Sequence, residues 1–234
     1  MTAASALRTS PEATSQAALA SCYRLIGELL LNPEMRDPAR IEKGRRALAA
    51  APAAVREAVE AFLASPSATD VDEYTAVLEL TPPVPLYLGT YLYDEPQSCR
   101  GAGVSGRNGY MIEVAAVYGH FGFALQGGEL ADYLPAMVEF LALSLEGKDR
   151  DTIGVRRRFV EQQVVPALPP LRKALAKFDS AYGLLIDALS AATEEDVISM
   201  FDGPMWVPSP DAGPRGRSGA RPADRETAGA LPNA

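Results

Sequence analysis

Apolar residues recur every three or four positions along most of the chain, which is the spacing of an amphipathic α-helix. The first such stripe lies between Ala17 and Leu31, and Asn32-Pro33 ends it because the residue before a proline disfavours helical geometry. The spacing therefore predicts a long amphipathic helix whose apolar face consists of Leu19, Cys22, Tyr23, Ile26, Leu29 and Leu30.

Capping residues and further stripes predict helices along the rest of the chain. Asp37-Pro38 and Ala51-Pro52 are typical cap and first-turn pairs, and Asp70 and Glu73 have the spacing of a capping box. Val55, Val59, Phe62 and Leu63 share one side of the helix after Pro52. The other expected helices span residues 70–80, 107–123, 134–147 and 152–165, and one long core helix carries Leu171, Leu175, Phe178, Tyr182, Leu185 and Leu189.

These patterns predict an all-α fold, because no segment has the repeated β-branched runs of a buried parallel sheet. We expect a single helical bundle of about nine helices, formed by residues 17–202 and connected by short loops rich in proline and glycine. Residues 1–16 are expected to be a flexible N-terminus. In residues 203–234, 11 of 32 residues are Gly or Pro, which predicts a disordered C-terminal tail.

Composition excludes some classes of function. The chain has 22 basic and 30 acidic residues, a formal net charge of -8, which disfavours a nucleic-acid-binding protein because phosphate contacts need clustered Lys and Arg. The longest apolar stretch, LIGELLL, is too short to span a membrane, and the N-terminus lacks an export signal. Cys22 and Cys99 are expected to be reduced thiols. Together these features predict a cytoplasmic protein that does not insert into membranes.

Gly101, Gly103 and Gly106 have the G-x-G-x-x-G spacing of a dinucleotide-binding loop. That motif binds phosphate when a buried strand leads into it and a helix N-terminus follows, and Pro96 interrupts any strand in front of these glycines. We therefore interpret the segment as a flexible loop that opens a helix near Arg107. A small nucleotide-dependent helical enzyme or regulator that uses this loop is the alternative interpretation.

The residues offer no recognisable catalytic set. His120 is the only histidine and has no second metal ligand or nucleophile nearby in the sequence, so it is expected to be a packed or surface residue. We predict no metal site, no cofactor and no enzymatic activity.

Charge and aromatic residues are distributed unevenly along the chain. Residues 70–146 hold 11 acidic side chains against two basic ones, and also seven of the nine tyrosines. Carboxylates beside aromatic rings suit the binding of a peptide that is both basic and apolar. The alternative is that the charges only solvate helix faces and the tyrosines only fill the core.

Four segments of this block resemble the core motifs of the molybdoenzyme assembly chaperones, the NarJ/TorD-like family, and are most similar to its nitrate reductase delta-subunit type. The segments are EYTAVLEL at 73–80, PLYLGTYLYDEPQS at 85–98, RNGYMIEVAAVY at 107–118 and ELADYLPAMVEFL at 129–141. Looser similarity extends the resemblance to about residues 19–196. Against the family pattern, SCRGAGVSGRNG separates Ser98 from Arg107, so the glycines look like an insertion in the binding-loop region.

The resemblance implies a chaperone that binds the N-terminal leader of the apo catalytic subunit of a molybdenum-containing reductase and keeps it competent for cofactor insertion. The chaperone is expected to be a monomer or weak dimer. We expect Glu95 and Asp132 to contact the leader directly. Glu113 and Glu139 either bind the leader's positive charge or, as the alternative, are structural partners of Arg107. The expected peptide-binding residues are Tyr87, Tyr91, Asp94, Glu95, Arg107, Met111, Glu113, Tyr118, Asp132, Tyr133, Leu134, Pro135 and Glu139.

Overall fold

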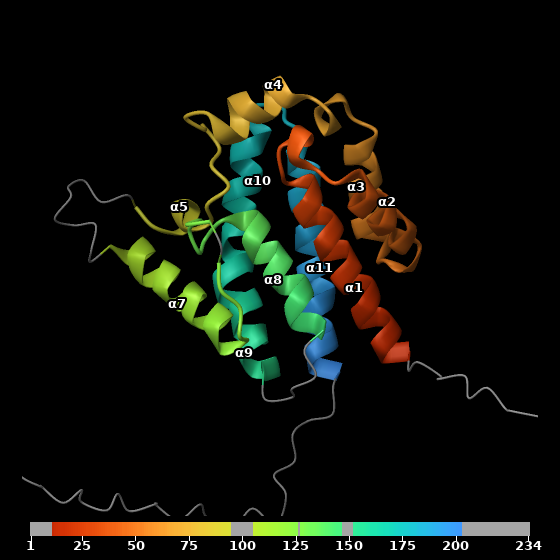
Figure 1. Ribbon diagram of the computed structural model, residues 1–234, viewed down its shortest axis with the longest axis vertical. Helices are drawn as coiled ribbons and strands as arrows, with labels where there is room; N and C mark the ends of the chain where they lie inside the picture. Colours follow the sequence, from red (N-terminus) through yellow and green to blue (C-terminus); the bar gives the residue numbers. More distant parts are fainter. Residues whose placement is uncertain (1–10, 95–104, 126, 147–151, 203–234) are drawn as a thin grey trace, which may run out of the picture. The chain divides into compact units, whose positions relative to one another are not determined.

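The computed structural model describes residues 11–94, 105–125, 127–146 and 152–202, and all regular elements in these residues are helical (Figure 1). The predicted all-α fold of about nine helices is thereby confirmed. The predicted tail at 203–234 lies outside the described residues. The α-helices are α1 (Pro11–Leu29), α2 (Pro38–Ala47), α3 (Ala53–Leu63), α4 (Val71–Tyr74), α5 (Gly89–Leu92), α7 (Gly106–His120), α8 (Leu134–Glu146), α9 (Ile153–Arg158), α10 (Leu168–Ala176) and α11 (Tyr182–Asp202).

Helix α1 packs against α2, α8 and α11, and α11 also packs against α3 and α10 (Figure 1). The helix begins at Pro11, earlier than the predicted start at Ala17. Its apolar face supplies much of the core, because all members of the predicted stripe are buried, and the prediction is confirmed for Leu19, Cys22, Tyr23, Ile26, Leu29 and Leu30.

Side-chain caps fix where several helices begin. The carboxylate of Asp37 accepts a hydrogen bond from the backbone N–H of Ala39 at 2.8 Å, and that of Asp70 accepts one from Glu73 at 2.8 Å. The predicted caps Asp37 and Asp70 are therefore confirmed, whereas the third predicted pair, Ala51-Pro52, is placed one residue too early, because Pro52 is the N-cap and α3 begins at Ala53. Ser105 caps α7 by accepting a hydrogen bond from the backbone N–H of Asn108, so a helix does begin beside Arg107 as the sequence predicts.

The predicted single helix from Leu171 to Leu189 is wrong. Helix α10 ends at Ala176 and α11 begins at Tyr182, and Asp179 between them has a left-handed φ of 49°. An apolar stripe cannot reveal this break, because buried residues on both sides of the turn keep the three-and-four spacing. Phe178, which the stripe places in the core, is instead 47% exposed at the turn.

Two other predicted helices change their winding partway. The helix predicted over residues 70–80 consists of α4 followed by a π-helical turn, Thr75–Glu79, and α9 likewise continues into the π-helical turn Phe159–Val164. A π-turn adds a residue to one helical turn. Apolar spacing does not resolve such an insertion, because Val77 and Val160 stay buried within these turns.

A buried polar network connects α1, α8, α9 and α11. The guanidinium of Arg156 on α9 donates to both carboxylate oxygens of Asp196 on α11, at 2.6 Å each, and to Ser144 Oγ on α8 at 2.9 Å. The hydroxyl of Tyr23 on α1 donates to Asp196 Oδ2 at 2.7 Å. Because the ion pair is almost fully buried, its geometry constrains how these four helices meet.

We expect Arg156→Met to lower the free energy of unfolding by about 3–5 kcal/mol, because removing one partner leaves the Asp196 carboxylate buried and unpaired. Urea unfolding followed by circular dichroism measures the change. Arg172→Met is the matched control, since its ion pair with Asp187 is half exposed and is worth less than about 1 kcal/mol. Equal losses in the two variants would contradict the prediction.

Candidate functional site

Two extended segments, Leu86–Leu88 and Asp132–Leu134, lie side by side and carry several of the predicted peptide-binding residues. The backbone N–H of Leu134 donates to the carbonyl of Leu86 at 2.7 Å, and that of Leu88 donates to the carbonyl of Asp132 at 2.9 Å. These bonds form an antiparallel bridge between Tyr87 and Tyr133. The bridge fixes the register of the segment before α5 against the segment before α8.

Extended backbone alternates its side chains between two faces, and the bridge therefore separates an inner from an outer layer. Leu86 and Leu88 are buried on one segment, as are Asp132 and Leu134 on the other. Tyr87 and Tyr133 point the other way and are half-buried, with ring centroids 5.4 Å apart. The two tyrosines form a small aromatic surface over the bridge.

Asp132 lies in the inner layer with a fully buried side chain. Its Oδ2 atom accepts hydrogen bonds from the backbone N–H of Gly89 at 3.1 Å and from Nε of Arg107 at 3.1 Å. Its Oδ1 atom has no hydrogen-bond partner among the described residues. The guanidinium of Arg107 also lies 5.8 Å from the ring centroid of Tyr87, so it contacts both a carboxylate and an aromatic face.

Carboxylates flank the tyrosine pair. The hydroxyl of Tyr87 donates to Glu129 Oε1 at 3.1 Å. Burial raises the pKa of Tyr87 from 10.0 to about 12, and this hydrogen bond contributes a smaller part of the increase. Burial also raises the pKa of Tyr133, and the negative charges of Glu129 and Glu79 add to the effect. Both carboxylates are exposed to solvent, where a cationic ligand can reach them.

The structure places the thirteen predicted peptide-binding residues in different surroundings. It brings Tyr87, Arg107, Asp132 and Tyr133 together, and it pairs Arg107 with Asp132. Glu113 accepts a hydrogen bond from Gln163 instead, at 3.1 Å. The buried members are Tyr118, Asp132, Leu134 and Pro135, and the half-buried members are Tyr87, Tyr91, Arg107, Met111 and Tyr133. The exposed members are Asp94, Glu113 and Glu139, and Glu95 lies outside the described residues.

Several of the predicted residues support the packing of the site. The hydroxyl of Tyr118 donates to the carbonyl of Ala131 at 3.0 Å, and its ring packs against Phe140 with centroids 4.9 Å apart. Tyr91 donates to the carbonyl of Pro85 at 2.8 Å, which holds the segment before α5. Met111 packs against the core from α7.

Sequence reasoning missed Glu129 and Gly89 as parts of the site. A Cβ atom on Gly89 would lie 2.7 Å from Asp132 Oδ2 and 2.9 Å from Arg107 Cγ, so only glycine leaves room for the ion pair. The alternation of Leu86, Tyr87 and Leu88 was the available signal, because period-two spacing indicates extended backbone even without a full strand.

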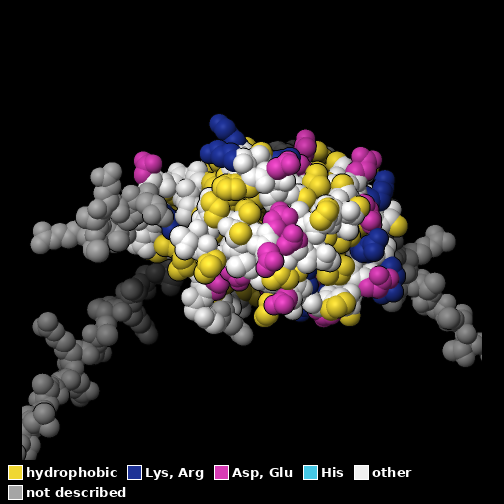
Figure 2. All heavy atoms as spheres, turned by 90° about the horizontal axis from the view of Figure 1, so that it is seen from above, with side chains coloured by type: hydrophobic (Ala, Val, Ile, Leu, Met, Phe, Trp, Pro, Cys, Tyr) yellow, Lys and Arg dark blue, Asp and Glu magenta, His cyan; other side chains and the backbone are white. Residues whose placement is uncertain are grey.

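Figure 2 shows the end of the bundle at which α4 lies, where acidic side chains lie among hydrophobic ones and Lys and Arg lie mostly nearer the edge. Exposed carboxylates of this region include Asp70, Asp72 and Glu79, and Leu80 is 73% exposed. Acidic and apolar side chains of α4 and the π-helical turn that follows it therefore lie at the surface.

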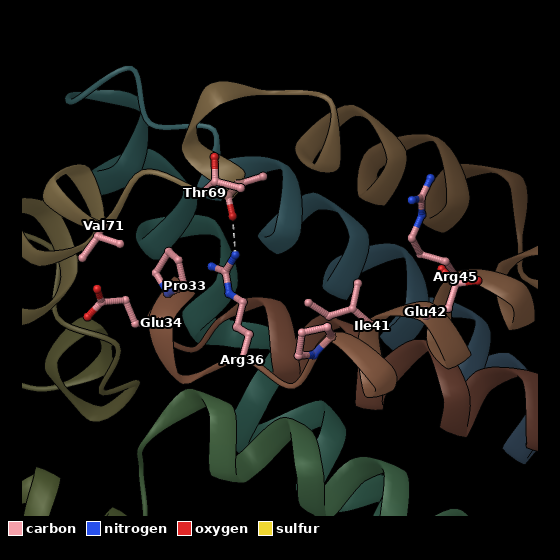
Figure 3. A pocket seen from close by; sticks show the side chains of 10 residues that line it. Pro33, Glu34, Arg36, Ile41, Glu42, Arg45, Thr69 and Val71 are labelled. Carbon is pink, nitrogen blue, oxygen red and sulfur yellow. Dashed lines mark hydrogen bonds between the residues drawn. The ribbon is translucent and has the colours of Figure 1, made fainter.

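A pocket of about 410 Å³ lies between α2 and the turn before α4, and neither Tyr87 nor Tyr133 lines it (Figure 3). Arg36 at this pocket donates to the carbonyls of Leu29, Leu31 and Ala68 and to the hydroxyl of Tyr182. The bonds to Leu29 and Leu31 satisfy backbone carbonyls at the C-terminal end of α1. The pocket contains none of the predicted site residues, and the role of Arg36 there is structural.

Other candidate chemistry finds little support in the part of the chain that the structure describes. Residues 81–94, which precede the glycine motif, form a bridge and the short α5 rather than a strand. His120 is exposed in the last turn of α7, as predicted. Within the same residues no cluster of three potential metal ligands occurs, and no helix has both the length and the apolarity to cross a membrane.

The family described as nitrate reductase delta subunit matches residues 45–171, more than half of the 234 residues. The matched region includes the bridge, Arg107, Asp132 and the tyrosine pair. No curated protein matches the chain.

We expect Gly89→Ala to destabilise the protein by about 1–3 kcal/mol, because the added methyl group would force Asp132 and Arg107 apart. Gly109→Ala on α7 is the matched control, because a Cβ there has no neighbour within 4 Å. The control should be neutral or stabilising by up to about 1 kcal/mol, since alanine favours the helix. Thermal unfolding distinguishes the two, and a neutral Gly89→Ala would mean that the ion pair tolerates displacement.

Stability should fall at alkaline pH. The pKa of Tyr87 is raised to about 12, and burial also raises the pKa values of Tyr23, Tyr110 and Tyr118. Because the raised values favour the neutral phenols in the fold, their contribution is complete below about pH 10 and is lost as the pH rises above it. Urea unfolding across this range measures the loss, which Tyr87→Phe should reduce. A fall in stability confined to acidic pH would contradict this assignment.

Proposed function

Because the chain belongs to the nitrate reductase delta subunit family, a family of molybdoenzyme assembly chaperones, we propose that it binds the N-terminal leader of a reductase catalytic subunit. The client is nitrate reductase or a related molybdenum-containing enzyme. By holding the leader in the cytoplasm, the chaperone keeps the apo subunit competent for insertion of the molybdenum cofactor.

The tyrosine pair between exposed carboxylates is the observation that carries this proposal. Tyr87 and Tyr133 offer aromatic surface to the apolar part of a peptide, and Glu79 and Glu129 offer negative charge to its basic part. Amphipathic rings next to carboxylates accommodate both kinds of side chain in one short segment. A basic leader with apolar residues has the matching chemistry.

The roles of the acidic residues differ with their burial. Asp132 is buried and positions Arg107, so it is not a surface charge in the client-free protein. Glu79 and Glu129 are exposed and stand beside the tyrosines, which makes them the first contacts for a basic peptide. Glu95 is a further candidate from the sequence.

A nucleotide-dependent role for the glycine motif has weaker support. A phosphate cradle of this type requires a strand that delivers the first glycine, and the described residues before the motif contain none. A chaperone role needs no bound cofactor and no catalytic group.

We expect the N-terminal leader peptide of a nitrate reductase catalytic subunit to bind more weakly as salt rises, because exposed charges are screened. The double variant Glu79→Gln and Glu129→Gln should weaken binding several-fold, in proportion to two exposed charge contacts. Isothermal titration calorimetry measures both effects.

Glu42→Gln is the matched control, since Glu42 is exposed on α2 and pairs with Arg46 away from the tyrosines. It should bind the leader as the wild type does. Salt-independent binding that none of these variants changes would show that the acidic and aromatic surface is not the leader site.

A further inference from the structure

We propose that Arg107 occupies, in the client-free protein, the place that an arginine side chain of the client takes on binding. Asp132 with Tyr87 is then an arginine-binding site that the protein's own arginine fills. This inference rests on the proposed function, because it assumes that the client presents a basic peptide, and it adds how the site is regulated.

The Asp132 carboxylate uses only part of its hydrogen-bonding capacity. A carboxylate has capacity for about four donors. Oδ2 accepts from Gly89 and from Arg107, while Oδ1, also buried, has no partner among the described residues. Leaving a charged oxygen buried without a donor costs free energy. A second donor group brought by a ligand would remove that cost.

The geometry around Asp132 and Tyr87 suits a guanidinium group. Arg107 reaches Asp132 through Nε and places its planar group 5.8 Å from the ring centroid of Tyr87. An arginine that approaches end-on can donate to both carboxylate oxygens at once, which Arg107 does not do with Asp132. A lysine has neither the paired donors nor the flat surface that stacks on a ring.

The position of Arg107 favours its displacement by a competing arginine. It lies in the first turn of α7, where the positive end of the helix dipole disfavours a cation, and its side chain is 18% exposed. Arg156 shows the contrasting case, since its side chain is 5% exposed and binds both oxygens of Asp196 at 2.6 Å. The Arg107 side chain borders water, whereas that of Arg156 is enclosed.

The test uses short synthetic peptides of leucine, serine and alanine with a single arginine, lysine or citrulline. Arg107→Met removes the internal competitor and should bind the arginine peptide roughly fivefold more tightly or better, because an occupied site lowers apparent affinity by its free fraction. The affinity of this variant for the lysine peptide should increase less, and its affinity for the citrulline peptide should increase least. Asp132→Asn should abolish the preference for arginine.

Arg46→Met is the matched control. It removes one positive charge from an exposed pair on α2, so it makes the protein more acidic without touching the site. If it tightens binding as much as Arg107→Met does, the gain is due to net charge and the proposal is overturned.

A second measurement does not depend on the stability of any variant. In wild-type protein, the Nε–H resonance of Arg107 should shift when the arginine peptide is added, while that of Arg156, bonded to Ser144, should not. Peptide binding that leaves the Arg107 signal unchanged overturns the proposal and leaves leader binding intact. Failure of wild-type protein to bind either the arginine peptide or the reductase leader contradicts the proposed function itself.

Discussion

The buried ion pair between Arg156 and Asp196 determines how the helices of this protein meet. Its two parallel hydrogen bonds, together with those to Ser144 and Tyr23, join α9, α11, α8 and α1 in one polar contact. Apolar faces can slide past one another with little loss, but a fully desolvated charge pair is stable only in one arrangement. The bundle therefore has a defined register at the level of α8, and α8 begins at the residues that form the tyrosine bridge.

The site depends on that register. Residues 131–133 lead directly into α8, so the position of α8 sets which side chains of the preceding segment point inward. Asp132 lies inside because it is one residue from the outward-facing Tyr133. Arg107, from the first turn of α7, then supplies the compensating charge, and Gly89 leaves the space for it. A carboxylate, a guanidinium and two rings from three parts of the chain are assembled in this way.

Sequence patterns predicted most of the helices and the chemical character of the site, because apolar spacing and capping residues act over a few positions. They could not predict features that depend on distant contacts. The stripe from Leu171 to Leu189 concealed the turn at Asp179, since apolar spacing continues across it. The position of Asp132 before a predicted helix suggested exposure, and only pairing with Leu86–Leu88 places it inside. The partner of Arg107 was likewise unforeseen, because Asp132 is remote in sequence.

The burial of Cys22 makes its thiol a reporter of helix separation. It lies on the core-facing side of α1, and burial raises its pKa to about 11, so very little reactive thiolate exists near neutral pH. A thiol reagent can therefore modify Cys22 only in molecules where α1 has moved away from its neighbours. The rate of alkylation in native protein measures how often the bundle opens, and its change on adding a client would show whether chaperone and client are stabilised together.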